Sequence, residues 1–294
     1  MKYHTPVLAS ETLSLLRIQP HKIYIDATIG NGGHSIKILK KGGTVYGLDQ
    51  DPINLQLTTE RIKKLKLNNF HPIHGNFSQL SSLIKKHIKN PSEIRGVLFD
   101  LGLSSNQQKS HHRGFSFNDN LSLDMRLDPS CQKTTAEFII NTAPFSELVH
   151  LFSFYAQEKQ AKPLTIRIIN QRQKAPIKSA KRLADIIRQY YKQKNIKTKI
   201  DPSTKIFLAL KIIVNQEFKN LTKALDQTLS LPPTSVAVFI SFHSGEDRII
   251  KRFIKKHQKE IVSLTAKPLK PQQSEIDKNP LSRSAILRAF QILP

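Results

Sequence analysis

The chain has 294 residues, of which 46 are lysine or arginine and 22 are aspartate or glutamate, so its formal net charge is +24. Hydrophobic residues make up 38% and charged residues 23%, a globular composition that excludes a largely disordered chain. The cationic excess predicts an electropositive surface and a polyanionic partner bound in a salt-sensitive way. Basic residues spread evenly over the surface are the alternative.

Cysteine usage and hydropathy exclude further classes. Cys131 is the only cysteine, which rules out an intrachain disulfide and a cysteine-based zinc site. The first residues lack the apolar run of a secretory signal. The longest apolar stretch, residues 236–242, has the length of a strand and is far too short for a membrane span. A cytoplasmic enzyme or RNA-binding protein remains.

Strand-like and helix-like segments alternate over the first hundred residues. Strands are predicted at residues 22–27, 44–48, 70–74 and 96–99. Helices are predicted at residues 34–40, 52 to about 67, and 80–88. Such alternation indicates βαβ units and a parallel sheet whose strands all end at one edge.

The pattern becomes helical after a polar, glycine-containing segment at 107–128. Helices are predicted at residues 136–141, 146–169, 180–194 and 205–221, the first capped by Thr134 with Glu137 three residues on. A strand returns at 236–242, followed by a helix from 246 to about 256. We therefore expect an α/β domain (1–108 and 206–294) interrupted by a helical, substrate-binding insertion (109–205).

A glycine-rich segment follows the first predicted strand and opens the next helix. It reads Asp26-Ala27-Thr28-Ile29-Gly30-Asn31-Gly32-Gly33-His34. Glycine permits positive φ and close approach of the backbone to a ligand. The spacing departs from the dinucleotide GxGxxG pattern, because Ser35 stands where the last glycine would be. By itself the segment fits a ligand-binding loop or an ordinary tight turn.

Asp49 ends the second predicted strand, roughly 20 residues beyond the glycines, where nucleotide-binding folds place an acid that binds ribose hydroxyls. A turn-forming role before Pro52 is the alternative for Asp49 taken alone. Together, the glycine segment and Asp49 suit either a nicotinamide cofactor or S-adenosylmethionine.

Two more strand ends carry candidate contacts. Phe77 follows the third strand, where it either flanks an adenine or is a plain core residue. Asp100 ends the fourth strand, and ligands of doubly wound sheets bind at the carboxyl ends of the strands. We expect Asp100 to face the reacting centre and to contact the amino group of methionine or an exocyclic base amine.

Taken together, these segments closely resemble the family of bacterial ribosomal RNA small subunit methyltransferase H, also called MraW. The matches span essentially the whole chain, and they comprise His4-Thr5-Pro6-Val7-Leu8 with Glu11, the segment from Asp26 to Ser35, Asp49-Gln50-Asp51-Pro52, Phe99-Asp100-Leu101-Gly102-Leu103-Ser104-Ser105 with Gln107, Arg113-Gly114-Phe115-Ser116-Phe117, Leu123-Asp124-Met125-Arg126, Ala209-Leu210-Lys211 with Val214-Asn215, Ser241-Phe242-His243-Ser244 with Glu246-Asp247-Arg248, and Asn279-Pro280 with Arg283-Ser284-Ala285. RGFSF, LDMR and FHSxEDR have no generic structural interpretation.

The resemblance implies a class I (Rossmann-like) methyltransferase fold with an inserted all-helical domain, S-adenosylmethionine as cofactor, and no metal. It implies methylation of N4 of a cytidine in the decoding centre of 16S rRNA. The cofactor contacts expected from it are Gly30, Gly32, Gly33, His34, Asp49, Phe77, Asp100 and Gln107. The chain departs from the family at Tyr155-Ala156-Gln157-Glu158, at Gly245 in place of leucine, and at Lys205, Leu208 and Lys211, none of which lies in a cofactor motif.

The implied chemistry assigns further roles. The N4 lone pair of cytosine is delocalised, so catalysis means aligning that nitrogen with the methyl sulfonium after the base leaves its stack. Residues expected beside the reacting groups are Asp100, Ser104 and Ser105. Substrate contacts are expected from Arg113, Phe115, Asp124, Arg126, His243 and Arg248, with ion pairing or core packing as the alternative for each. Basic runs at 159–162, 167–174, 178–188 and 192–199 either grip the rRNA backbone or are solvated helix faces.

Three other interpretations compete. A nicotinamide oxidoreductase explains the glycines and Asp49 but not the basic excess. A DNA amino-methyltransferase is the second interpretation. Those enzymes commonly carry Asp/Asn-Pro-Pro-aromatic after strand four, where this chain has Asp100-Leu101-Gly102-Leu103. The third is a non-catalytic ribosome-assembly factor. The favoured interpretation makes the small ribosomal subunit the partner, without a membrane, and leaves the choice between monomer and homodimer open.

Overall fold

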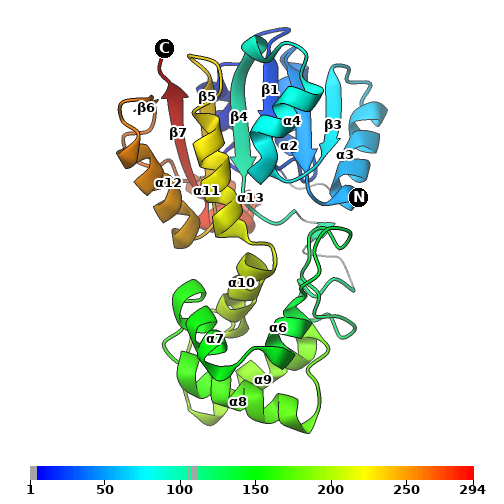
Figure 1. The fold of residues 1–294 in the computed structure, drawn as a ribbon, viewed down its shortest axis with the longest axis vertical. Helices are drawn as coiled ribbons and strands as arrows, with labels where there is room; N and C mark the ends of the chain where they lie inside the picture. The colour runs from blue at the N-terminus through cyan, green and yellow to red at the C-terminus, as the bar shows by residue number, and fades with distance from the viewer. Residues whose placement is uncertain (1–4, 105, 108–111) are drawn as a thin grey trace. The chain divides into compact units, whose positions relative to one another are not determined.

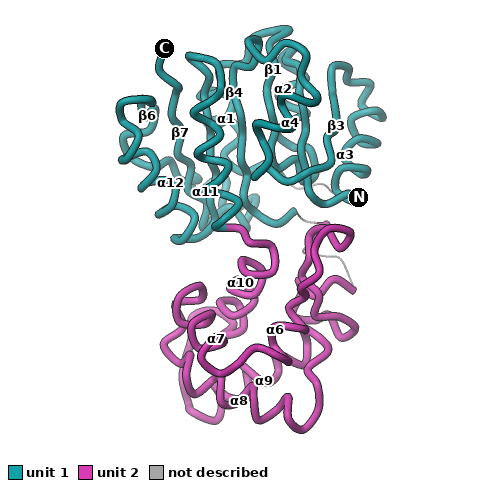
Figure 2. Tube along the Cα trace, in the orientation of Figure 1, with its two compact units in different colours: residues 1–105, 218–294 teal, residues 106–217 magenta. Residues whose placement is uncertain are grey.

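The computed structural model describes residues 5–104, 106–107 and 112–294. The chain forms two compact units: unit 1 comprises residues 1–105 and 218–294, and unit 2 comprises residues 106–217 (Figure 2). The expected insertion, 109–205, is shorter than unit 2 at both ends. The larger difference arises because α10 (Ser203–Val214) buries Ile206, Ala209 and Leu210 in the core of unit 2.

Unit 1 is built on a sheet of seven strands within the described residues, in the order β3-β2-β1-β4-β5-β7-β6 (Figure 1). The strands are β1 (Ile23–Asp26), β2 (Thr44–Asp49), β3 (Phe70–His74), β4 (Ile94–Asp100), β5 (Val236–Ser241), β6 (Ile261–Ser263) and β7 (Ile286–Ile292). β1 to β5 are mutually parallel, whereas β7 is antiparallel to both β5 and β6. The expected α/β fold is confirmed, and β6 and β7 are two strands of it that are not predicted from the sequence.

Helices cover both faces of this sheet. On one face, side chains from α1 (Ala9–Leu16), α2 (Gly33–Lys40) and α3 (Pro52–Lys64) join the core cluster around Tyr24 and Val238. On the other, α4 (Leu80–His87), α11 (Glu217–Thr228) and α12 (Ser244–Lys256) pack on the cluster around Phe99 and Phe239, whose rings stack at 4.6 Å. Successive strand residues point to opposite faces, so every strand except β6 contributes side chains to both clusters. A short helix, α13 (Gln273–Lys278), precedes β7.

Unit 2 is helical. Its helices are α6 (Ala136–Thr142), α7 (Phe145–His150), a π-helical turn at Leu151–Tyr155, α8 (Ala161–Lys174), α9 (Ala180–Gln193) and α10. They enclose one apolar cluster that also includes Leu123 and Met125 of the preceding loop. No helix among the described residues of either unit is long and apolar enough to cross a membrane.

Three predicted helix boundaries are wrong. The helix expected at 146–169 is interrupted after the π-helical turn, where Gln157 has a φ of +49°. The one expected at 205–221 is split at Gln216, also at +49°, because the Asn215 side chain donates to the carbonyls of Met125 and Lys211. The cap of α6 is Thr135 rather than Thr134, since the Thr135 hydroxyl accepts the Phe138 N–H at 3.0 Å.

Candidate active site

The glycine-rich turn after β1 is sterically confined. Gly30 and Gly32 have φ of +49° and +73°, a region that L side chains rarely adopt. A Cβ on Gly32 would lie 2.5 Å from Thr58 Cγ2 of α3, and one on Gly33 would lie 3.0 Å from Pro6 Cβ. The turn therefore packs closely against its neighbours, and its backbone leaves no side chain between itself and a ligand.

Asp49, at the end of β2, is joined to this turn. Its carboxylate accepts the N–H of Gly30 at 3.0 Å through Oδ2 and that of Asp51 at 2.9 Å through Oδ1. The side chain is buried, and burial raises the pKa of Asp49 to about 7 against the opposing effect of these hydrogen bonds. Each carboxylate oxygen has two lone pairs, and Oδ2 also lies 3.4 Å from Asn54 Nδ2, so one acceptor site, on Oδ1, is left for a ribose hydroxyl.

Three polar side-chain atoms of the neighbouring residues His34 and Asp100 lack hydrogen-bond partners among the described residues. His34 Nε2, in the first turn of α2, lies 3.5 Å from Asp100 Oδ2 at the end of β4. His34 is 5% exposed, and neither of its ring nitrogens nor Asp100 Oδ1 has a hydrogen-bond partner among the described residues. Buried polar atoms are nearly always hydrogen-bonded, so unpartnered ones indicate a ligand that completes them.

Two residues of the Asp26-Ala27-Thr28 motif support that pair. Asp26 is 1% exposed and accepts the Ser35 hydroxyl at 2.6 Å. Burial raises the pKa of Asp26, and the nearby His34 counteracts this. Thr28 Oγ1 accepts the backbone N–H of Asp100 at 2.5 Å. Neither Asp26 nor Thr28 is predicted as a site residue from sequence, although both lie inside the recognised motif.

The loop after β4 also reaches the glycine turn. The Ser104 hydroxyl donates to Asn54 Oδ1 at 3.0 Å, and Asn54 Nδ2 in turn lies 3.4 Å from Asp49 Oδ2. Ser104 Cβ is 3.5 Å from the position that a Cβ on Gly30 would take. Asn54, missed in the sequence, therefore links the two. Ser105 lies outside the described residues.

Phe77 begins a 3₁₀ turn after β3. The Asn76 side chain caps this turn by accepting the Ser78 N–H at 2.8 Å, and it donates to Gln50 Oε1 at 2.6 Å. The Phe77 ring lies edge-on to Phe99 at a centroid distance of 5.8 Å and remains partly exposed. It is thus both a core contact and an accessible ring at the edge of the sheet.

The segment after β5 is arranged around α12. His243 occupies the N-cap position of the helix without a side-chain capping bond, and its Nε2 lies 3.0 Å from Glu246 Oε1. Glu246 Oε2 accepts the Phe242 N–H at 3.0 Å. Asp247 is held by Arg288 of β7, with Nε–Oδ1 at 2.6 Å. Arg248 is exposed. Of the expected substrate contacts here, His243 is engaged within the segment, and Arg248 is solvent-accessible.

The predicted substrate residues of unit 2 lie in one loop whose side chains contact one another. Arg126 binds Asp124 through two hydrogen bonds of 2.7 and 2.6 Å. Arg113 donates to the carbonyl of Arg126 at 3.1 Å and lies over the Phe115 ring at 5.4 Å. Gly114 has a φ of +74°, and a Cβ there would meet the Asp124 backbone nitrogen at 2.7 Å. These contacts show that the RGFSF and LDMR motifs fold against each other.

The structure thus gathers the expected residues into separate sets. Those at the carboxyl edge of β1, β2 and β4 in unit 1 are Gly30, Gly32, Gly33, His34, Asp49, Asp100 and Ser104. The loop of unit 2 contains Arg113, Phe115, Asp124 and Arg126. Gln107 also belongs to unit 2, and its side chain is buried. His243 and Arg248 belong to the β5–α12 segment of unit 1.

The sheet order, with antiparallel β7 between β5 and β6, and the glycine turn beside an acid on β2 define a class I methyltransferase fold. The model of the MraW methylase family matches residues 1–293, and the chain belongs to that family. It is therefore a methyltransferase, with S-adenosylmethionine as its cofactor.

Similar curated proteins cover the full length. The chain is 38% identical over 298 residues to ribosomal RNA small subunit methyltransferase H of Sulfurihydrogenibium azorense, covering 100% of both chains. It is 35% identical over 312 residues to the protein of the same name from Halothermothrix orenii, covering 99% of each.

Proposed function

We propose that this enzyme transfers a methyl group from S-adenosylmethionine to N4 of a cytidine in the decoding centre of 16S rRNA, in the cytoplasm. Support comes from the full-length relatives named ribosomal RNA small subunit methyltransferase H and from the net charge of +24. The observation that carries the proposal is the contact of buried His34 with partly exposed Asp100, whose unpartnered polar atoms lie beside the glycine turn.

The residues present fit the methyl donor. The turn at Gly30, Gly32 and Gly33 presents backbone to the donor, because an added Cβ at these positions would meet the protein's own Ser104, Thr58 and Pro6. Asp49 Oδ1 keeps one acceptor site for a ribose hydroxyl. In the proposal, Phe77 flanks the adenine, and His34, Asp100 and Gln107 contact the remainder of the donor. When bound, the donor supplies an electrophilic methyl group on a sulfonium.

The protein's own contribution is alignment. A cytosine amine is a weak nucleophile. Holding it at the distance and angle of attack lowers the barrier, chiefly because binding has already removed its translational and rotational freedom. In the proposal, the Asp100 carboxylate accepts a hydrogen bond from that amine, which favours pyramidal nitrogen in the transition state. Ser104 acts beside it by fixing the loop through Asn54. Ser105 is included on sequence grounds.

The loop of unit 2 and the β5–α12 segment are proposed to hold the RNA. Arg113, Phe115, Asp124 and Arg126 contribute a shaped surface whose side chains are already fixed by mutual contacts, and His243 and Arg248 contribute from the other segment. Preordered contacts lose less side-chain entropy when a partner binds.

A basic helical face is proposed to bind the rRNA backbone. α9 turns Leu183 and Ile187 into the core of unit 2, and leaves basic side chains of the preceding turn, the helix and the following loop exposed. These exposed side chains are Lys178, Lys181, Arg182, Lys192, Lys194, Lys197 and Lys199. Lysines near phosphate release counterions on binding, so affinity falls with salt.

Two measurements test the proposal. Calorimetry on ligand-stripped protein is expected to show uptake of S-adenosylmethionine, and its absence would sink the enzymatic account. Mass-spectrometric mapping of 16S rRNA, from cells lacking the gene and after incubation of their small subunits with enzyme and donor, is expected to show one cytidine gaining a methyl group on N4. Methylation elsewhere, or on the ring carbon, contradicts the proposed site.

The RNA-binding face has its own test. Charge reversal at Lys178, Lys192 and Lys194 together is expected to weaken RNA binding and flatten its salt dependence, by about one unit of log–log slope for each phosphate that the variant no longer neutralises. Reversal at exposed Lys63, Lys64 and Lys66 of unit 1 together makes the same charge change away from this face and serves as the control. An unchanged salt slope in the triple variant contradicts this placement.

A further inference from the structure

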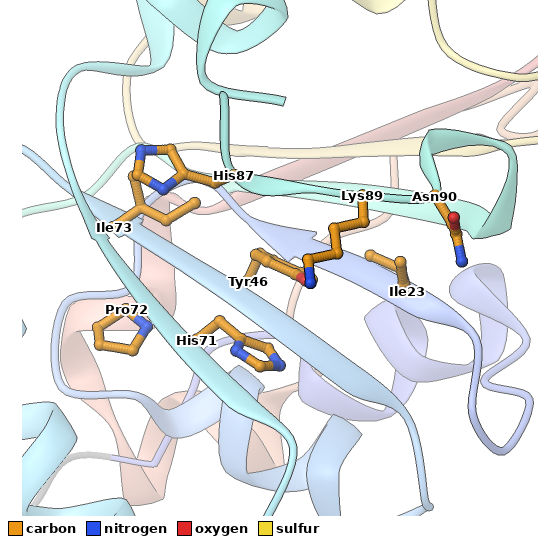
Figure 3. Close-up of a pocket in the computed structure, with 8 residues that line it drawn as sticks. All are labelled: Ile23, Tyr46, His71, Pro72, Ile73, His87, Lys89 and Asn90. Atoms are coloured by element: carbon orange, nitrogen blue, oxygen red, sulfur yellow. The ribbon is translucent and has the colours of Figure 1, made fainter. Parts of the chain in front are cut away.

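A groove in unit 1 is lined by none of the residues of the proposed methyl-transfer site. It has a volume of about 560 Å³ and is lined by side chains of β1, β2 and β3 and by the end of α4 with the segment after it (Figure 3). Ile23 of β1 and Ile73 of β3 form the apolar part of its wall. Tyr46 of β2 and His71 of β3 also line it. Pockets of this size hold small organic groups such as a nucleotide.

The groove contains a pair of stacked rings. Tyr46 and His71 are register partners in the sheet, and their ring centroids lie 4.5 Å apart with planes inclined by 21°. His71 is exposed and Tyr46 partly so, which leaves the pair accessible to a further planar ring. Stacking on such rings is the main way in which proteins bind unpaired nucleobases.

Cationic and amide groups border these rings. Lys89, in the segment after α4, extends along the groove in the direction of Tyr46, and Asn90 and His87 come from the same stretch of chain (Figure 3). None of the eight lining residues, all within the described chain, is acidic. The nearby acid Glu93 is occupied by an ion pair with Lys22. The local charge therefore favours an anion.

We propose that this groove binds an unpaired nucleotide of RNA, with its base on the Tyr46–His71 pair and its phosphate at Lys89. Asn90 supplies an amide that can donate to and accept from a base edge. An aromatic platform with an adjacent cation is the arrangement that single-stranded nucleic acids require. The inference rests on the proposed RNA substrate, and it extends the contact surface of that substrate.

The nucleotide bound here is not the one that is methylated. Tyr46 precedes Asp49 by three residues in β2, which is about 10 Å along a strand. Ile23 likewise begins β1, whereas Asp26 ends it. The groove therefore holds a flanking nucleotide and contributes affinity and register, leaving the chemistry at the other edge of the sheet.

The test compares Lys89→Glu and His71→Ala with Lys86→Glu, which makes the same charge change at an exposed position of α4 that does not line the groove. Binding of a fluorescent single-stranded oligouridine is measured against salt concentration for each full-length protein. Loss of one stacked base is expected to weaken binding about fivefold or more, and loss of Lys89 to reduce the salt slope by about one. Lys86→Glu is expected to show the smaller, long-range effect of one charge.

A second measurement locates the contact. Oligouridine containing 4-thiouridine is crosslinked by near-ultraviolet light, and the modified peptides are identified by mass spectrometry. Crosslinks at Tyr46 or His71 that disappear in Lys89→Glu support the proposal. Crosslinks confined to other parts of the chain overturn it, as does wild-type RNA affinity in both groove variants.

Donor uptake by calorimetry separates this inference from the proposed function. Loss of RNA binding in the groove variants, with normal uptake of S-adenosylmethionine, supports the groove. If the wild-type protein takes up donor yet binds no RNA, both the proposed substrate and the groove are refuted. If the groove variants change the sedimentation coefficient but not RNA affinity, the groove is an interface between copies of this chain, and the proposal fails.

Discussion

The backbone N–H of Asp100 donates a hydrogen bond of 2.5 Å to the hydroxyl oxygen of Thr28. This bond joins the ends of β4 and β1, the two strands that carry the proposed reacting centre and the glycine turn. It fixes the backbone from which the Asp100 carboxylate projects toward His34. Thr28 is therefore a positioning residue, and its substitution can be distinguished from a change at the reacting groups.

Thr28→Val keeps the shape of the side chain but removes the acceptor for this N–H. This hydrogen bond is only partly buried, so losing its acceptor is expected to lower the unfolding free energy by about 1 kcal/mol in urea titrations. The single-turnover methyl-transfer rate is expected to fall more than donor affinity does. Thr28→Ser restores the hydroxyl and should recover both, and failure of that rescue would contradict the positioning role.

Asp100→Asn removes the negative charge while retaining the size of the side chain. If the carboxylate stabilises the developing positive charge of the attacking amine, the single-turnover rate should fall about a hundredfold, the usual loss when one preorganised electrostatic interaction is removed. Stopped reactions with excess enzyme and radiolabelled donor measure this step apart from product release. A rate equal to that of the wild type removes Asp100 from the chemistry.

Asp49 gives the protein a stability that depends on pH. Burial raises the pKa of Asp49 to about 7, so the native state holds a proton that the unfolded chain, titrating near 4, releases. Because the native state binds more protons in this window, stability is fully present below pH 4 and is lost as pH rises toward 7. The loss for this one group is on the order of 4 kcal/mol.

Asp49→Asn removes this titration. Unfolding free energies of the two proteins are measured in urea from pH 4 to 8 without donor. The stability of the wild type relative to the variant is expected to fall by about 4 kcal/mol as pH rises, because only the wild type carries this titration. The raised pKa of Asp26 acts in the same direction in both proteins and cancels in the comparison. Parallel curves for the two proteins would show that the pKa of Asp49 is not raised in the native state.

Local sequence signals predicted much of the fold and of the site edge. Gly30 and Asp49 each follow a strand with clear apolar character, and a parallel sheet brings such strand ends together. The proximity of Asp100 to the glycine turn follows from the same rule. The bonds between Asn54 and Ser104 and between Asp26 and Ser35 are tertiary, and no spacing in the chain specifies them.

The missed features have physical explanations too. Gln157 and Gln216 adopt left-handed φ without being glycine, so the two helix breaks carry no local signal. Strand β7 (ILRAFQI) has polar residues only at Arg288 and Gln291, three apart, so its sequence lacks the strict alternation that indicates a half-buried strand. Its antiparallel pairing with β5 depends on tertiary packing. Asn215, predicted only as part of a motif, determines the end of α10 by binding the loop around Met125.

The departure from the family at Gly245 has a structural explanation. A Cβ at this position would lie 2.4 Å from Cζ of Phe218 and 3.2 Å from Nδ1 of His243. The Phe218 ring thus fills the space that the family's usual leucine would take. Overfilling a packed site typically costs about 1–3 kcal/mol, so Gly245→Leu is expected to destabilise the protein by that amount in urea unfolding.

Combining Gly245→Leu with Phe218→Ala is expected to relieve the clash, because the leucine then occupies the volume that the ring vacates. The double variant should be more stable than the sum of the two single changes predicts, by about 1 kcal/mol or more, as residues in direct contact are coupled. A double-mutant cycle of unfolding free energies measures this coupling directly. Additive effects would mean that the ring moves aside freely, and Gly245 would then not be required by Phe218.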